Sequence, residues 1–228
     1  MKYAVIVGAS SSIGKNIAKT LLDNKYNLIL TYNNNEINKE IFNNKLNIEI
    51  IKCDVTKEED IINLYEKTKN KNIELLINAQ AICLDNYIND KTKEEFMKVL
   101  EVNLVGTFLT TKYMLKIMKK GDIINISSLD STKSFNNYSV DYIASKAGVN
   151  SLVKTMSLDY KDIRFISILL PFVDTSSIRE MNEELLKEEM NKYNQKRLMT
   201  VSEVSNKIIT IINDKTIKSG SIIEVEDF

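Results

Sequence analysis

Short apolar runs alternate along the chain with longer segments in which apolar residues recur every three or four positions. Seven of the runs are strand candidates, and they read KYAVIV, YNLILTY, LNIEIIKC, IELLIN, GDIINIS, RFISILL and SIIEVE. They are rich in β-branched residues and mostly lack alternating polar positions, which is typical of strands covered on both faces. The pattern therefore predicts a sheet buried between layers of helices.

The segments between these runs have helical periodicity. Ile13, Ile17 and Leu21 predict one helix, and a longer helix is predicted by Phe96, Leu100, Leu104, Phe108 and Leu115. The repeated order of strand and helix predicts a parallel, doubly wound seven-stranded sheet, whose ligand site lies beyond the carboxyl ends of the strands. Because no repeat, linker or domain break interrupts the pattern, residues 1–228 are expected to form a single α/β domain.

Composition narrows the classes of function. The 31 basic residues balance 31 acidic ones, so the chain lacks the net charge that attracts nucleic acid or an anionic membrane. No apolar run approaches the roughly 20 residues of a membrane span, and the chain opens on a strand-like segment rather than a signal-peptide pattern. We therefore expect a cytoplasmic protein with a small or weakly charged ligand.

The two cysteines, Cys53 and Cys83, have neither the spacing of metal ligands nor that of a disulfide framework. We interpret both as buried free thiols, since reduced cysteine behaves as a small apolar side chain. The compartment is then expected to be reducing, and no metal site is predicted.

The first predicted strand runs directly into the segment GASSSIGKNIAKTLL. In this context Gly8 permits a tight turn, and Gly14 permits close packing of the helix on the strand. Unpaired amides and the positive end of the helix dipole suit a pyrophosphate. The segment therefore predicts a dinucleotide-binding loop, although a plain turn with a helix cap requires much the same residues.

Further motifs follow in the order CDV, INAQ, VNLVGTF, IINISS, YIASKAG and PFVDT. Together with VGASSSIG they resemble the motifs of the short-chain dehydrogenases/reductases, and the resemblance covers essentially the whole chain. It implies a single-domain Rossmann fold and the catalytic residues Asn103, Ser128, Tyr142 and Lys146. The cofactor contacts that it implies are Gly8, Ser10, Ser11, Ser12, Ile13, Gly14, Tyr32, Asn33, Asp54, Val55, Asn78, Ala79, Tyr142, Lys146, Pro171, Val173 and Thr175.

The pair of Tyr142 and Lys146 gives a chemical reason for the resemblance in a chain without histidine. Reducing a ketone requires a proton donor near the carbonyl oxygen, and a free tyrosine has a pKa of about 10. The two residues are four apart, so they are expected to share a helix face on which the ammonium lowers the tyrosine pKa by roughly 3 units. Taken alone, the pair is more typical of an ordinary exposed helix face.

Two other residues complete the implied catalytic set. Ser128 ends a predicted strand, where it can donate a hydrogen bond to the substrate carbonyl oxygen or simply cap a loop. Asn103 stands in a predicted amphipathic helix, although asparagine is a poor helix former. It is expected either to hold a water that relays protons to Lys146 or to face solvent.

The choice of cofactor depends on the end of the second predicted strand, which reads LILTYNNNE and has no acid before Glu36. An acid there would bind the ribose 2′-hydroxyl of NAD and repel the extra phosphate of NADP. Hydrogen bonds and charge for a 2′-phosphate can come instead from Thr31, Tyr32, Asn33, Lys15 or Lys39. NADP(H) is therefore favoured and NAD(H) is possible, while the segment can also be a plain turn.

Three positions depart from the family pattern. Ser12 replaces the middle glycine of the loop, Gln80 stands where the family favours glycine, and the glycine usual after Pro171 is missing. We expect these changes to alter the walls of the site rather than its reacting groups, with cofactor affinity in question at Ser12.

The substrate is the least determined feature. Residues 174–197 predict a short amphipathic lid, although an ordinary surface helix has the same pattern. The chain most resembles the 3-oxoacyl-[acyl-carrier-protein] reductase branch, which implies NADPH-dependent reduction of a 3-keto group to a secondary alcohol in fatty acid biosynthesis. The alternatives are reduction of another small or protein-bound ketone, cofactor binding without catalysis, and a purely structural role.

The resemblance also implies a homodimer or homotetramer built on the helices around 96–118 and 140–160. These segments carry more apolar residues than one buried face requires, for example Tyr113, Met114 and Met118. We expect these side chains to contribute to the interface.

Overall fold

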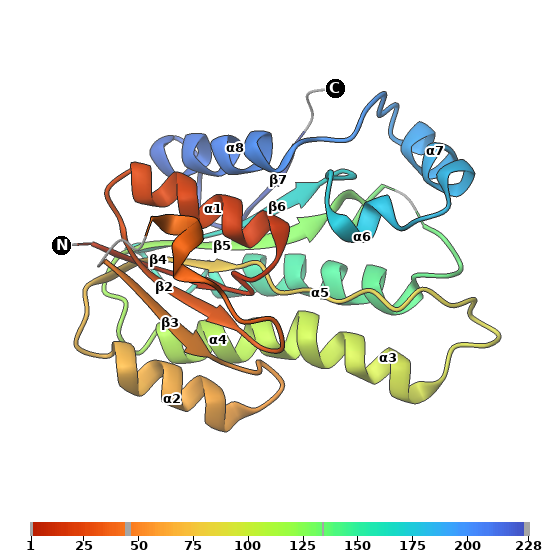
Figure 1. The fold of residues 1–228 in the computed structure, drawn as a ribbon. Helices are drawn as coiled ribbons and strands as arrows, with labels where there is room; N and C mark the ends of the chain where they lie inside the picture. Colours follow the sequence, from red (N-terminus) through yellow and green to blue (C-terminus); the bar gives the residue numbers. More distant parts are fainter. Residues whose placement is uncertain (1, 44–46, 134, 226–228) are drawn as a thin grey trace.

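A single parallel sheet forms the centre of the structure, a computed structural model that describes residues 2–43, 47–133 and 135–225. Its seven strands lie in the order β3-β2-β1-β4-β5-β6-β7, which confirms the predicted sheet (Figure 1). The strands are β1 (Tyr3–Val7), β2 (Asn27–Tyr32), β3 (Ile48–Lys52), β4 (Ile73–Asn78), β5 (Gly121–Ser128), β6 (Ile163–Leu170) and β7 (Ser221–Glu224).

Helices cover both faces of this sheet, as predicted (Figure 1). On one face lie α1 (Ser12–Asp23) and α8 (Val201–Asn213), and on the other lie α2 (Glu58–Thr68), α4 (Gly106–Met114) and α5 (Val140–Met156). Successive side chains of β1 enter opposite cores: Ala4 and Ile6 pack toward α1 and α8, whereas Val5 and Val7 pack toward the other layer. Strands buried on both faces explain the apolar runs without polar alternation.

The long helix predicted around residues 96–115 is continuous but not regular. It comprises α3 (Lys93–Leu100), the π-helical segment η2 (Glu101–Val105) and α4. A π-helical turn inserts an extra residue into the helix, and such turns are frequent at functional sites. Asn103 lies inside this turn and is fully buried, so the expectation that it faces solvent is wrong.

The apolar side chains that we expected at the subunit interface are not on the surface of this structure. Tyr113, Met114 and Met118 are buried in the core of this chain, where they pack beneath the sheet. The large apolar residues of the same helical region that remain exposed are Met97, Val105 and Phe108, each exposed by 41–42%. Apolar composition alone could not separate these two groups, because it does not show which face of the helix packs on the sheet.

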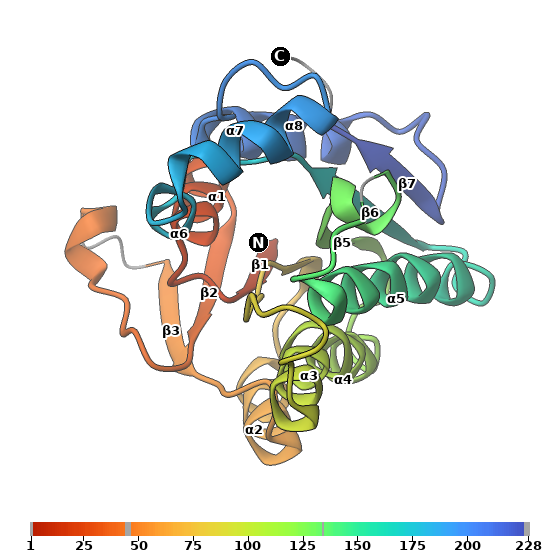
Figure 2. The ribbon, with the colours of Figure 1, turned by 90° about the vertical axis from the view of Figure 1, so that its right-hand side faces the viewer.

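The strand order reverses between β1 and β4, so crossovers leave the centre of the sheet in both directions. A ligand site is expected at such a switch point, outside the carboxyl ends of the strands. Figure 2 views the molecule from this end, with α6 (Ser176–Arg179), α7 (Glu183–Lys192) and η3 (Leu129–Ser131) around the strand ends. The predicted site residues gather at this edge.

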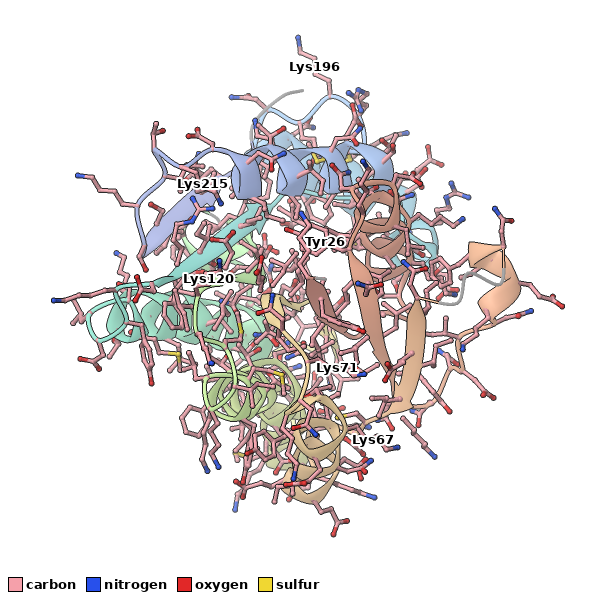
Figure 3. The ribbon with its side chains drawn as sticks, turned by 90° about the vertical axis from the view of Figure 1, so that its left-hand side faces the viewer. Tyr26, Lys67, Lys71, Lys120, Lys196 and Lys215 are labelled. Carbon is pink, nitrogen blue, oxygen red and sulfur yellow. The ribbon has the colours of Figure 1, made fainter. Side chains whose placement is uncertain are left out.

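Figure 3 shows the amino-terminal edge of the sheet, where two of the labelled lysines belong to ion pairs. Lys71 lies 2.7 Å from Glu49, and Lys215 lies 3.6 Å from Asp122. In each pair the opposite charges are close enough to attract each other. No helix in the described part of the chain is long and apolar enough to cross a bilayer.

Candidate active site

The turn between β1 and α1 depends on the absence of side chains at two glycines. Gly8 has a φ of +75°, and a Cβ atom there would lie 2.7 Å from the backbone of Gln80. A Cβ atom at Gly14 would lie 2.6 Å from the carbonyl oxygen of Gly8. Neither position can accept a side chain without displacing backbone, so the turn is held tightly against β4.

Ser11 connects this turn to the first helix. Its Oγ accepts a hydrogen bond from the Gly14 amide and donates one to the Gly8 carbonyl, both at 3.0 Å. The helix begins at Ser12, whose backbone has no positive φ, so the replacement of the family glycine requires no strained conformation. The first turn of α1 contains no acidic residue, which leaves its positive end suited to a pyrophosphate.

Beside the turn, Gln80 retains an unpaired polar atom. The Nε2 of Gln80 donates to Thr107 Oγ1 at 3.0 Å, while its buried Oε1 has no hydrogen-bond partner. An unpaired buried acceptor is costly unless a ligand or water satisfies it. The turn without side chains, the helix start and this acceptor fit a nicotinamide dinucleotide, which would be held by Gly8, Ser10, Ser11, Ser12, Ile13 and Gly14.

The end of β2 differs in part from the expectation for a 2′-phosphate. Thr31 is buried, and its Oγ1 accepts a hydrogen bond from the Gly8 amide at 3.3 Å, so this residue supports the turn instead. Burial raises the pKa of Asp54, but hydrogen bonds from Thr56 and Asn33 outweigh burial and lower it. Tyr32 is partly exposed and lies beside this group.

Asn78 has a different environment from the one its predicted role suggests. Its side chain is buried and bonds Asn125 Oδ1 at 2.9 Å and Thr111 Oγ1 at 3.2 Å, so it joins β4 to β5 and α4. The adjacent Ala79 amide bonds the Val7 carbonyl at 3.0 Å. In this structure the Asn78 side chain therefore supports the sheet below the cofactor site.

Tyr142 and Lys146 lie in the first half of α5, at the carboxyl ends of β5 and β6. The ammonium of Lys146 donates to the Ile126 carbonyl at 2.8 Å and lies 5.6 Å from the centre of the Tyr142 ring. Lys146 is only 2% exposed, and burial lowers its pKa to about 8. The pair is therefore part of a buried site and not an ordinary exposed helix face.

The pKa of Tyr142 differs from the expectation. Burial raises it, and the neighbouring Cys83, Asp130 and Asp85 raise it further, whereas only a hydrogen bond with Ser128 lowers it. The predicted lowering by about 3 units is therefore wrong for the protein without ligands. The sequence argument counted the attraction of Lys146 but not the loss of hydration of a buried phenolate.

Asn103 connects the π-helical turn to the strand ends. Its Oδ1 accepts from the Ile82 amide at 2.9 Å, and its Nδ2 donates to the Ile82 carbonyl at 2.9 Å and to Ser145 Oγ at 3.0 Å. The side chain thus fixes the segment after β4 against α5, one residue away from Lys146. Its donors and acceptor are used by these contacts.

Several side chains near Tyr142 could not be identified from sequence. Lys91 and Asp141 form a buried ion pair of 2.7 Å across 50 residues of chain, and the Asp141 carboxylate also accepts from the Tyr142 amide. Cys83 was expected to be buried, but it is exposed and lies 3.0 Å from Asp85. Cys53 is buried as expected, and its pKa is raised to about 12, chiefly by burial.

The segment of residues 174–197 lies over the same edge (Figure 2). Beside its start, Val173 is buried and pairs with Met199, while the Thr175 side chain caps α6. Gln195 holds the segment by bonding both backbone groups of Phe172, at 3.0 Å to the amide and 2.7 Å to the carbonyl. This polar clamp connects residues 23 positions apart.

Comparisons with known proteins agree with this geometry. A family model described as enoyl-(acyl carrier protein) reductase matches residues 8–226. An uncharacterized oxidoreductase of Staphylococcus saprophyticus is 35% identical over 186 residues, covering 76% of this chain and 79% of the relative. The 3-oxoacyl-[acyl-carrier-protein] reductase of Bos taurus is 29% identical over 194 residues, covering 82% and 81%.

A solved structure extends the agreement to the fold. The structure of ElxO with NADP bound has a TM-score of 0.82 and 26% identity, and the match covers 99% of this chain and 97% of that one. The parallel sheet, the glycine turn and the matching motifs therefore have one explanation. The chain belongs to the short-chain dehydrogenase/reductase family of nicotinamide-dependent oxidoreductases, within which it resembles the 3-oxoacyl-[acyl-carrier-protein] reductase branch.

Proposed function

We propose that the protein reduces a ketone to a secondary alcohol with NADPH, and that the ketone is a 3-oxoacyl thioester carried by acyl carrier protein. The observation that supports this most is the convergence of Ser128, Tyr142 and Lys146 at the strand ends that also carry the glycine turn. A tyrosine and a serine at the carboxyl edge can both reach one carbonyl oxygen above a bound nicotinamide.

In this proposal the nicotinamide would supply the hydride. The side chains bind the carbonyl oxygen of the substrate and supply its proton. Tyr142 gives its proton to the carbonyl oxygen as negative charge develops there. Its raised pKa keeps the phenol protonated at neutral pH, which suits a proton donor in the reductive direction. Ser128 donates to the same oxygen, and Lys146 places a positive charge beneath the tyrosine and bonds the cofactor ribose.

The preference for NADPH rests on the end of β2. Among the described residues of this strand end, Tyr32 and Asn33 present polar groups and no acid follows until Glu36. Lys15, in the first turn of α1, is partly exposed and can supply positive charge. An acid at this strand end is the group that would repel a 2′-phosphate, and the nearby Asp54 is held after β3 by hydrogen bonds from Thr56.

We infer an acyl substrate from the relatives, one of which is named as a 3-oxoacyl-[acyl-carrier-protein] reductase. We propose residues 174–197 as a lid over this substrate, because the segment covers the carboxyl edge and is held by Gln195. Another small or protein-bound ketone is the alternative. Cofactor binding without catalysis leaves the convergence of Ser128, Tyr142 and Lys146 without a purpose.

We further propose a cytoplasmic homodimer or homotetramer. Val105 and Phe108 are exposed by 42% and 41% on the helical layer, beside a hollow lined by Leu104, Gly148, Ser151, Leu152 and Thr155. A second copy would cover this apolar surface. Light scattering at micromolar concentration is expected to give at least twice the mass of one chain, and a monomer alone would contradict this proposal.

A substrate panel tests the proposed function. Oxidation of NADPH is followed by absorbance with acetoacetyl thioesters of acyl carrier protein and of coenzyme A, and with sugar, cyclic and short linear ketones. Turnover with the thioesters at the highest kcat/KM supports the proposal. A higher kcat/KM with another ketone would show that the substrate is not an acyl thioester. No turnover with any ketone, despite cofactor binding in calorimetry, would favour the non-catalytic alternative.

A further inference from the structure

Asp130 lies two residues after Ser128 and contacts its hydroxyl directly. The Oγ of Ser128 donates to Asp130 Oδ2 at 3.1 Å, while the Asp130 amide donates back to Ser128 Oγ at 3.2 Å. This arrangement caps the short helix η3 at the end of β5. It also fixes the direction of the one proton that Ser128 can donate.

The second oxygen of the same carboxylate contacts a remote part of the chain. Asp130 Oδ1 accepts a hydrogen bond from the hydroxyl of Tyr193, which is 63 residues away at the end of α7. The Tyr193 ring lies 6.3 Å from the ring of Phe172, whose backbone is held by Gln195. One carboxylate therefore joins the catalytic serine to the 174–197 segment.

The proton of Ser128 has more than one possible acceptor. A hydroxyl with one proton cannot donate to Asp130 and to a substrate oxygen together. A donor on the other oxygen of Asp130 makes the carboxylate a weaker acceptor for Ser128. The contact of Tyr193 therefore bears on the direction in which Ser128 donates.

We propose, on the basis of the function proposed above, that Asp130 is a positioning residue that orients the Ser128 hydroxyl according to whether Tyr193 of the overlying segment is in place. When the segment lies as in this structure, Tyr193 occupies Asp130 Oδ1, and a substrate carbonyl can compete for the Ser128 proton. When the segment moves away, the Ser128 hydroxyl keeps donating to Asp130. It is then less able to stabilise the negative charge that develops on the substrate oxygen.

The charges around this contact must be considered in any test that uses pH. The ionisable groups that face Tyr142 and Asp130 from the neighbouring elements are Cys83, Asp85, Tyr138, Lys146, Glu189, Lys192 and Tyr193. Of these, burial and then Glu189 raise the pKa of Tyr138, and burial is also the main cause of the raised pKa of Asp130. Each variant should therefore change one of these groups, or Asp130 itself, and leave the others in place.

Kinetics of three variants separate positioning from a purely structural role. Tyr193→Phe removes the contact and keeps the charge, so kcat for acetoacetyl thioester should fall about fivefold, the value of one hydrogen bond, with an unshifted pH profile. Asp130→Asn and Asp130→Ala remove a negative charge near Tyr142. In alcohol oxidation, which needs the phenolate, both should move the rising limb of the profile to lower pH.

The same variants carry two further readouts. Asp130→Asn keeps a carbonyl acceptor of the same size and should retain more kcat/KM than Asp130→Ala. The double variant Asp130→Ala with Tyr193→Phe should be no worse in kcat than Asp130→Ala alone, because both changes break one contact. Matched controls are Asp159→Asn, on an exposed aspartate after α5, and Tyr160→Phe, whose ring packs on Phe165.

An assay that needs no turnover keeps this inference separate from the proposed function. Trypsin should cut the overlying segment at Arg179, Lys187 or Lys192 faster in Asp130→Ala and in Tyr193→Phe than in the parent and both controls. Parent protein that reduces no ketone would contradict the proposed function alone. Unchanged trypsin cutting, losses of kcat that multiply in the double variant, or an unshifted profile in both Asp130 variants would overturn the inference.

Discussion

The cofactor side and the substrate side of the carboxyl edge are built by different means. On the cofactor side, the turn at Gly8 and Gly14 depends on close backbone packing, because a Cβ atom at either glycine would meet backbone atoms. On the side covered by residues 174–197, the contacts are made by side chains: Asp130 accepts from Tyr193, 63 residues away, and Gln195 bonds the backbone of Phe172, 23 residues away. The difference predicts that a backbone change will act mainly on cofactor binding, whereas side-chain changes will act mainly on the 174–197 segment.

The largest expected effect concerns Lys146, which lies between the two sides. The variant Lys146→Ala should lower kcat/KM by about 10³-fold, because it removes the positive charge beside Tyr142 and the ribose contact that we propose. Cofactor affinity should fall as well. Steady-state kinetics and calorimetric titration with NADPH measure the two losses, and affinity equal to that of the parent would show that Lys146 does not hold the ribose.

A backbone change should damage the cofactor side next most strongly. In Gly8→Ala the added Cβ would lie 2.7 Å from the Gln80 backbone at a φ of +75°, so NADPH affinity should fall by at least about tenfold. Gly220→Ala is the matched control, since its φ is +85° and its Cβ would meet the Ser157 side chain instead. Equal losses of affinity in both variants would indicate general destabilisation.

The preference for NADPH over NADH should change when a residue at the end of β2 is substituted. In Tyr32→Asp a carboxylate faces the ribose, so the preference for NADPH over NADH should reverse, with a change of about tenfold to a hundredfold in relative kcat/KM. Tyr32 is a better position than Asn33, because a second carboxylate at Asn33 would face Asp54. Tyr32→Asn controls for loss of the ring, and a parent preference for NADH would show that the segment is only a turn.

The smallest effect is expected on the substrate side. Met190 is the buried side chain by which α7 packs the 174–197 segment onto the protein, so Met190→Ala should loosen that segment and raise KM for the ketone several-fold. The dissociation constant of NADPH should stay within about twofold. Both values come from kinetics and from titration, and a larger loss in cofactor affinity than in KM would remove the distinction between the two sides.

The strands and the glycine turn could be predicted from the sequence, because they depend on residues that are close together in the chain. Short apolar runs located all seven strands, and the glycine turn could be predicted because Gly8 and Gly14 meet within six residues. Sequence left open whether Asn103 lies in the site or faces solvent, since no sequence signal marked the π-helical turn. The contacts of Lys91 with Asp141 and of Asp130 with Tyr193 were also missed, because they depend on tertiary packing across 50 and 63 residues.

The Tyr142→Phe variant tests the central claim most directly, when turnover and cofactor binding are measured on the same preparation. The change removes only the hydroxyl and leaves the Lys146 contact to Ile126 in place. We predict that reduction of acetoacetyl thioester falls by at least about 10²-fold, while the dissociation constant of NADPH stays within about twofold of the parent. Full turnover in Tyr142→Phe would contradict the assignment of Tyr142 as the proton donor.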